Sequence, residues 1–462
     1  MNTLFSMINV GSNALTAHQN RLALHQQNIA NASTPGYRRQ RVGLSTFAGA
    51  HNVGALKGVA LGATRSIDAP LTDRQLVSQR AGFGYHSARA QVGAVVESYF
   101  DPVNGTDITG QVNEFFASLR GLSSNPGNGP ERREVVARAE AMARSFRQTA
   151  SSLRETQGDI AVEAQDAVGE VNARLERIAA LDREIQVSGS GGAAVGDLVD
   201  ERDRLVTEVA NDLQLRVTRT GDGMLHLATE SGHAVVHDGR ANTLTAEVGD
   251  DGDLSFSLAS GVGGATRLDD LGGRLGGLAS SHNDMIGARL SELDQLAFDF
   301  ASAFNAAHSG GVALDGSTGN NLFTIPGSAE GAAELIAVDP AILDNADLLA
   351  TTSDPSTLPG GSDLLQQLIA LEDQALSGGE SLHGGLVSIT QSIGVDVRDA
   401  NEAMASSSAS IAQLENVQAS ISGVSLEEEL LSINEAQRAF EAALRIIETT
   451  EEMMDSVMML GA

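Results

Sequence analysis

Residues Leu426 to Leu460 read LEEELLSINEAQRAFEAALRIIETTEEMMDSVMML, and one row of positions in this segment alternates without a break between steps of four and three residues. The row passes through Gln437 and Glu451, and its other members are the apolar residues Leu426, Leu430, Ile433, Phe440, Leu444, Ile447, Met454 and Met458. This spacing is typical of a helix that packs along another helix. Because the segment contains no proline, we expect one helix about 50 Å long. A lone amphipathic helix is marginal in water, so it requires a partner surface.

The N-terminal segment offers such a partner. Its own row of fours and threes contains Gly11, His18 and His25, and its large apolar members are Leu4, Ile8, Leu15, Leu22 and Ile29. No acidic residue precedes Asp68, whereas the last helix is acidic apart from Arg438 and Arg445. Opposite charge favours pairing between these two helices over pairing of two helices of the same charge. Two interpretations remain open: a hairpin within one chain, and a seam that assembles with other chains, for which the two apolar rows are the predicted interface.

The composition of the chain excludes several classes of partner and of site. The chain has 462 residues, with 60 acidic and 30 basic side chains and a formal net charge of −30. This charge argues against nucleic acid or an anionic membrane as a partner. The chain has no cysteine, which excludes disulfides and thiolate metal sites, and no apolar run long enough to span a membrane. Its N-terminus lacks the pattern of a signal peptide, so we expect no cleaved leader and no membrane insertion.

The rest of the chain predicts a mainly α, elongated, multi-domain protein with a small β insert. Helical periodicity runs from Glu131 to about Val187, where Gly158 and Gly169 are the expected points of interruption. Further helices are expected at 68–99, 197–211, 272–307, 364–376 and 382–421, and alternating strands at 213–218, 224–228, 234–237 and 254–258. The predicted domains are a terminal helix and turn (1–40) that pairs with 424–462, a helical middle domain in two parts (41–211 and 265–423), and an antiparallel β insert (212–264).

Sites for chemistry are not predicted. The sequence has no H-E-x-x-H, G-x-S-x-G or phosphate-loop motif. The β insert contains His226, His233 and His237, which we interpret as surface or hairpin histidines because they have neither a partnering carboxylate nor the spacing pattern of a metal site. The sequence therefore predicts no catalytic residue, no cofactor and no metal, and the protein is not expected to be an enzyme.

A polar motif follows the first helix. Residues 28–37 read NIANASTPGY, in which Pro35 and Gly36 suit the centre of a turn, so the helix should end near Asn31. Between an N-terminal heptad helix and an acidic C-terminal one, this motif resembles the bacterial flagellar axial family of rod, hook and hook-associated proteins. The residues that carry the resemblance are Asn28, Asn31, Thr34, Pro35, Gly36 and Tyr37.

Motifs in the middle of the chain are similar to one branch of that family, the hook-associated protein 1 family. They read GTDIT at 105–109, FFASL at 115–119, LSSNP at 122–126, GGRLGGL at 272–278 and FNAAH at 304–308. On physical grounds alone, Phe115, Phe116 and Leu119 are also expected to form the buried face of a short helix. One residue departs from the family pattern, because Arg38 stands where members often have serine.

The resemblance implies a function. Members of the family form a ring of identical subunits in the extracellular flagellum, between the hook protein and a second hook–filament junction protein. They are exported without a cleaved signal peptide by the flagellar type III apparatus, with a chaperone on the C-terminal segment. Two alternatives are another flagellar axial subunit, from hook or rod, and a secreted helical effector or adhesin. The latter explains the helices but not the paired terminal motifs.

Overall fold

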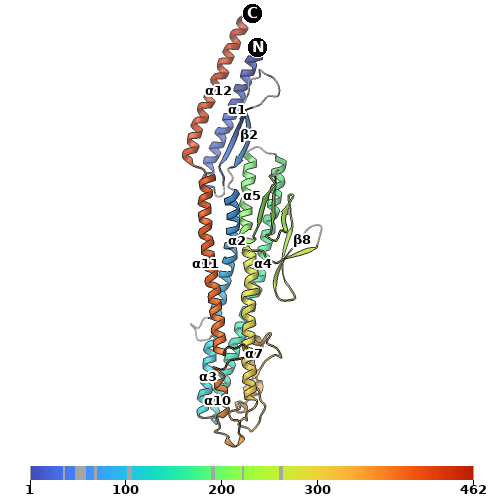
Figure 1. Ribbon diagram of the computed structural model, residues 1–462, viewed down its shortest axis with the longest axis vertical. Coiled ribbons are helices and arrows are strands. Elements are labelled where there is room, and N and C mark those ends of the chain that lie inside the picture. The colour runs from blue at the N-terminus through green and yellow to red at the C-terminus, as the bar shows by residue number, and fades with distance from the viewer. Residues whose placement is uncertain are drawn as a thin grey trace.

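A computed structural model describes residues 2–34, 37–46, 59–66, 70–100, 107–188, 193–220, 223–259 and 264–460. The molecule is a long rod whose helices run mostly along its axis, with both chain ends at the same tip (Figure 1). The predicted turn centre at Pro35 and Gly36 lies outside the described residues. Among the described helices, none is both long and apolar enough to cross a membrane.

The tip of the rod consists of the two terminal helices. Helix α1 (Asn2–Ala30) packs along α12 (Leu426–Leu460) in the opposite direction, and the strands β1 (Gln40–Thr46) and β2 (Val59–Ser66) form an antiparallel hairpin against α1. α1 ends one residue before the predicted stop at Asn31. The pairing of the first and last helices of the chain, suggested by their charges, is therefore present within one molecule.

The shaft is a bundle of long helices. α2 (Pro70–Tyr99) packs along α11 (Leu382–Ser422), and also contacts α5 (Ala193–Asp212) and α6 (Gly273–Ser280). The 60-residue helix α4 (Gly129–Ser188) is about 90 Å long. The expected interruptions at Gly158 and Gly169 do not occur. Each glycine faces open space and costs about 1 kcal/mol of helix propensity. The continuous buried stripe of α4 outweighs that cost.

The far end of the rod has an aromatic core. It joins α3 (Ile108–Ser124), α7 (Gly287–His308) and α10 (Asp363–Ala370) with the short elements β10 (Phe323–Thr324), α8 (Ala332–Leu335), β11 (Ala337–Val338) and α9 (Pro340–Asp344). Phe115 and Phe116 lie among three further phenylalanines, with ring centroids 5.4–6.5 Å apart. The predicted burial of Phe115, Phe116 and Leu119 is confirmed. α10 ends six residues before the predicted Leu376, because the chain closes into tight turns there.

The helix predicted at 272–307 contains a local irregularity. A π-helical segment, Ser281–Ile286, separates α6 from α7. Within it, the Asn283 side chain accepts a hydrogen bond from the backbone N–H of Leu254 (2.8 Å) and donates one to its carbonyl (2.9 Å). The irregular turn therefore ties the helix to the β insert, a contact that a helical sequence pattern does not reveal.

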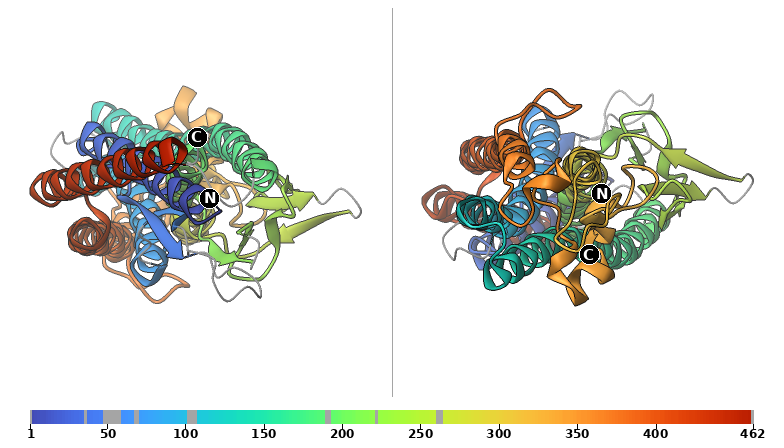
Figure 2. Two further views of the ribbon diagram at one scale, coloured as in Figure 1. Left: turned by 90° about the horizontal axis from the view of Figure 1, so that it is seen from above. Right: turned by 90° about the horizontal axis from the view of Figure 1, so that it is seen from below.

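The β insert contains two antiparallel sheets and stands to one side of the helices (Figure 2). One sheet has the order β3 (Arg216–Arg219), β4 (Leu225–Ala228), β5 (Ala234–His237) and β6 (Arg240–Ala241), and the other has β7 (Thr243–Val248), β8 (Leu254–Ala259) and β9 (Ala265–Leu268). The predicted strands are present, whereas β6, β7 and β9 were missed. α4 supports β7, because Asn172 bonds the backbone N–H and carbonyl of Leu244 at 2.8 Å each.

Candidate assembly site

The contact between α1 and α12 is centred on small side chains. On α12 the buried positions recur every seven residues, at Glu429, Ala436, Ala443 and Thr450. On α1 the buried positions include Gly11, Ala17 and Leu24, and a Cβ atom on Gly11 would lie 2.7 Å from Cγ1 of Ile447. A side chain at position 11 would therefore push the two helices apart, and glycine permits their close approach.

The predicted apolar row of α12 lies beside this contact rather than at its centre. Ile433, Phe440, Ile447 and Met454 are half-buried, as are Leu4, Ile8, Leu15, Leu22 and Ile29 on α1. The other members of the row remain exposed, at 52% for Leu426, 54% for Leu430, 38% for Leu444 and 66% for Met458. We call these four residues the outer row. α1 covers the flank of small residues because it can approach most closely there, and this leaves the outer row partly exposed.

At the base of the terminal pair, polar groups converge on one buried carboxylate. The Glu429 side chain is fully buried and accepts hydrogen bonds from Nδ1 of His25 (2.6 Å) and Nδ2 of Asn28 (3.1 Å). Its other oxygen lies 2.5 Å from Nε of Arg39. We call His25, Asn28, Arg39 and Glu429 the polar junction. It joins α1, the start of the hairpin and α12 in one network.

Asn28 also controls how the chain turns back. Its Oδ1 accepts hydrogen bonds from the Tyr37 hydroxyl (2.8 Å) and the backbone N–H of Gln40 (3.1 Å), while its Nδ2 donates to the Gln40 carbonyl (3.0 Å). Asn31 donates to the carbonyl of Gln27 and accepts from the hydroxyl of Thr34, and so closes the end of α1. The motif residues Asn28, Asn31, Thr34 and Tyr37 thus form a turn that returns the chain along α1.

The charge on Glu429 is favoured by its neighbours. Burial alone would raise the pKa of this carboxyl group, but hydrogen bonds from His25 and Asn28 and the charge of Arg39 outweigh burial and lower the pKa. Glu429 is therefore ionised at neutral pH. Its contribution to stability is present above the ordinary glutamate pKa and is lost as the pH falls through the lowered value.

The terminal pair is connected to the shaft next to the polar junction. Arg38 forms an ion pair with Asp73 of α2 (3.0 Å), lies 3.8 Å from Asp203 of α5, and donates its backbone N–H to Asp200 (3.4 Å). The backbone N–H of Arg39 bonds the carbonyl of Ser422 at the end of α11. Arg38 therefore lies among three acidic side chains of the shaft.

Models of known protein families match three segments of this chain. The family model described as "Flagellar hook-associated protein FlgK helical domain" matches residues 94–323. The models "Flagella basal body rod protein" and "Flagellar basal body rod FlgEFG protein C-terminal" match the two terminal segments, residues 8–38 and 419–460. The chain belongs to the flagellar hook-associated protein 1 family. It is accordingly a structural component of the bacterial flagellum.

Named members of the family are similar over much of the chain. Flagellar hook-associated protein 1 of Bacillus subtilis is 25% identical, over 99% of this chain and 98% of its own length. The Salmonella typhimurium protein is 28% identical over 69% of this chain, and the match spans only 59% of that longer protein. The structure of the flagellar hook junction protein FlgK from Burkholderia pseudomallei has the same fold, with a TM-score of 0.67 and 14% identity, covering 76% of this chain and all of that one.

Three members of the polar junction were not predicted from the sequence. His25 was placed in the row of fours and threes of the first helix, whereas Glu429, one acid in a run of three, and Arg39 were not predicted as site residues. A feature of the sequence that indicated such a contact is the N-terminal segment without acidic residues, because its basic side chains require acidic partners from elsewhere in the chain. No pattern within 427–429 distinguishes the buried acid from its exposed neighbours.

Asp200 provides a pH-dependent prediction for the connection to the shaft. Burial, opposed by the backbone N–H and charge of Arg38, raises the pKa of Asp200 to about 7. The folded protein therefore holds a proton that the unfolded chain releases near pH 4, so this group reduces stability as the pH rises from about 4 to about 7. We expect Asp200→Asn to raise the melting temperature at pH 8 more than at pH 5, measured by circular dichroism. The control is Asp250→Asn, at an exposed carboxylate in the turn between β7 and β8, and a larger gain at pH 5 would refute the assignment.

Proposed function

We propose that this chain joins the flagellar hook to the filament, and that it assembles with copies of itself through the outer row of α12. The names of its relatives support the location, since they are hook-associated and, for the Burkholderia protein, hook junction proteins. The role is structural and requires no catalysis. The proposed partners are further copies in a ring, the hook protein and a second junction protein. An export chaperone would hold the C-terminal segment during type III export, which leaves the N-terminus uncleaved and delivers the subunit outside the cell.

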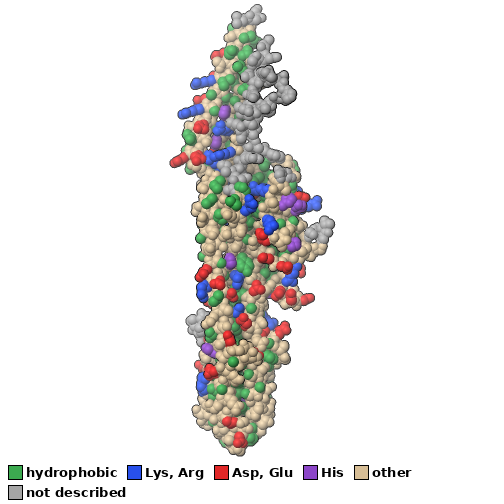
Figure 3. Space-filling view, viewed as in Figure 1, with side chains coloured by type: hydrophobic (Ala, Val, Ile, Leu, Met, Phe, Trp, Pro, Cys, Tyr) green, Lys and Arg blue, Asp and Glu red, His purple; other side chains and the backbone are tan. Residues whose placement is uncertain are grey.

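The exposure of the outer row is the observation that carries this proposal. Leu426, Leu430, Leu444 and Met458 keep heptad spacing on a helix whose adjacent flank is already paired with α1. Burial of each such side chain would contribute about 1.5–3 kcal/mol. Figure 3 shows apolar side chains along the terminal helices at the tip of the rod. A third helix from a neighbouring subunit would cover them and extend the pair into a layer of helices.

The domain organisation fits the same proposal. The terminal pair (1–40 with 424–462) would line the inner layer of the ring, and the helical middle domain (41–211 and 265–423) would form the next layer. The β insert (212–264) would face outwards. The position of both termini at one tip of the rod supports this order (Figure 1).

Mutation of the outer row tests the assembly surface. The triple variant Leu430→Gln, Leu444→Gln, Met458→Gln should change the free energy of unfolding of the monomer by less than about 0.5 kcal/mol at each of Leu430 and Met458, whose side chains are mostly exposed, and by about 1 kcal/mol at Leu444, which is 38% exposed. It should nevertheless abolish motility in complemented cells. The matched control is Leu431→Gln with Met459→Gln, at exposed apolar sites about 100° around α12 from Leu430 and Met458. Normal filaments on cells with the triple variant would exclude the outer row as the assembly surface.

Loss of the gene tests the location separately. Cells without the protein should make hooks that lack filaments and release filament protein into the medium, as seen by electron microscopy and immunoblotting. Cells that lack hooks altogether would instead point to a rod or hook subunit. Attached filaments would contradict any junction role.

A further inference from the structure

Two histidines lie opposite each other on neighbouring strands of the β insert. His226 is on β4 and His237 ends β5, and the register that pairs Leu227 with Val236 places them directly across from one another. Side chains at such positions share one face of the sheet. Their Nδ1 atoms are 2.9 Å apart, and their ring centroids are 4.2 Å apart at an angle of 82°.

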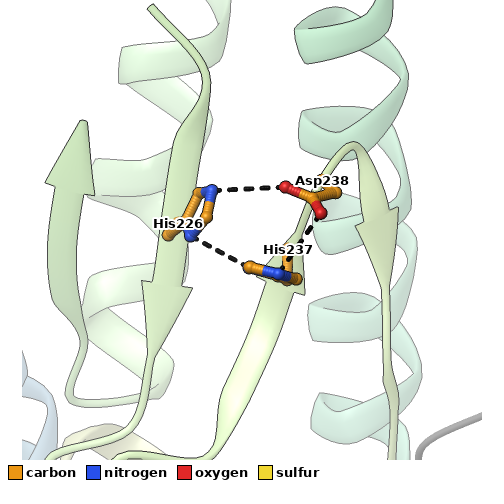
Figure 4. A group of neighbouring side chains, drawn as sticks. All are labelled: His226, His237 and Asp238. Carbon is orange, nitrogen blue, oxygen red and sulfur yellow. Dashed lines mark hydrogen bonds and ion pairs between the residues drawn. The ribbon is translucent and has the colours of Figure 1, made fainter. Parts of the chain in front are cut away.

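A carboxylate completes the group. Asp238 follows His237 directly, and its two oxygens lie 3.5 Å from Nε2 of His226 and 3.3 Å from Nε2 of His237 (Figure 4). The absence of a partnering carboxylate, assumed from the sequence, is therefore wrong. The third histidine of the insert, His233, lies outside this group and is hydrogen-bonded to Ser231 (2.9 Å).

The backbone holds Asp238 in place. His237 pairs with Arg240, so Asp238 and Gly239 are the two central residues of a hairpin turn, and both have positive φ angles of 49° and 67°. Asp-Gly is a preferred sequence for this turn, whose twist matches that of the strands. The turn is fixed to α4, because Arg183 donates a hydrogen bond to the Gly239 carbonyl.

We propose that His226, His237 and Asp238 bind a divalent transition-metal ion of the Zn²⁺ class. Each residue can supply one ligand atom, and these three atoms lie within 4.8 Å of one another. In a tetrahedral zinc site with bonds of about 2.0–2.1 Å, the ligand atoms are about 3.3 Å apart. Rotation of the imidazole rings about χ2, which is a soft torsion for histidine, closes the difference.

The chemistry of these ligands selects the ion. Two imidazoles and one carboxylate suit Zn²⁺, Ni²⁺ and Cu²⁺, whereas Mg²⁺ and Ca²⁺ prefer sites made only of oxygen. Three protein ligands leave one tetrahedral position for water or for an outside ligand. The site lies on the partly exposed surface of the β insert, away from the terminal helices, so it is independent of the proposed assembly surface.

Titration of the full-length chain with Zn²⁺, after removal of any histidine tag, tests the site. Calorimetry should show one ion per chain, and saturating Zn²⁺ should raise the melting temperature. His226→Ala and His237→Ala should each weaken binding at least 10-fold. Asp238→Asn keeps a residue that tolerates positive φ, and should also weaken binding about 10-fold. Mg²⁺ should have no effect.

His233→Ala is the matched control, because it removes a histidine from the loop between β4 and β5 without touching the group. It should bind Zn²⁺ as tightly as the unaltered chain. Visible absorption of bound Co²⁺ gives a second readout, since an intense tetrahedral spectrum should appear and be lost in His226→Ala. Absence of stoichiometric binding, or equal weakening by His233→Ala and His226→Ala, would overturn the proposal.

Discussion

Replacing Glu429 by alanine should detach α1 from α12 while the shaft remains folded. The substitution removes the only carboxylate that both His25 and Arg39 contact in the described part of the chain, and leaves these groups and Asn28 without their shared partner. Loss of one member of a buried ion pair typically costs about 3–5 kcal/mol. Amide hydrogen exchange should therefore speed up in α1 and α12, whereas exchange in α4 should not change.

Glu428→Ala is the control for this experiment. Glu428 is the adjacent residue and also contacts Arg39 (2.5 Å), but its side chain is 62% exposed, so its loss should cost less than about 1 kcal/mol. Glu429→Gln should have an intermediate effect, because it keeps the shape of the side chain but not the charge. Equal exchange rates in the alanine variants at 428 and 429 would show that the polar junction does not hold the terminal pair.

Deletion of Leu426 to Ala462 should abolish attachment of filaments while the middle of the chain stays folded. The continuous apolar core of the described residues extends from Val77 to Ile393 and includes no residue of α1 or α12. The truncated chain should therefore melt within a few degrees of the full-length chain. Cells that produce it should be non-motile, because both the partner of α1 and the outer row are gone.

A second truncation separates loss of assembly from aggregation. Without α12, the buried face of α1 that contains Ala17 and Leu24 would be exposed to water. Removal of residues 2–30 together with 426–462 should restore a monodisperse protein in light scattering and leave cells non-motile. Filaments that remain attached in either strain would contradict the role proposed for the terminal helices.

The outer row shows what the spacing of apolar residues predicted correctly and what it did not predict. Heptad spacing predicted both terminal helices and the row of apolar residues, because periodicity is a local property of the chain, and the opposite charges of the two helices predicted their pairing. It did not predict which flank of α12 meets α1. That choice depends on Gly11, Ala436 and Ala443, whose small size allows the closest approach of two helices. The larger residues of the row were left partly exposed, which the spacing did not indicate.

The amino-acid sequence by itself determined the long helices, the β insert, the turn motif at residues 28–37 and the resemblance to the flagellar family, since each follows from neighbouring residues. Only the tertiary structure decided that Glu429 meets His25 and that His226 meets His237 and Asp238. The first contact spans about 400 residues, and the second depends on the register of two strands. Polar contacts of this kind leave no periodic trace in a sequence, because the packing of the whole chain brings their members together.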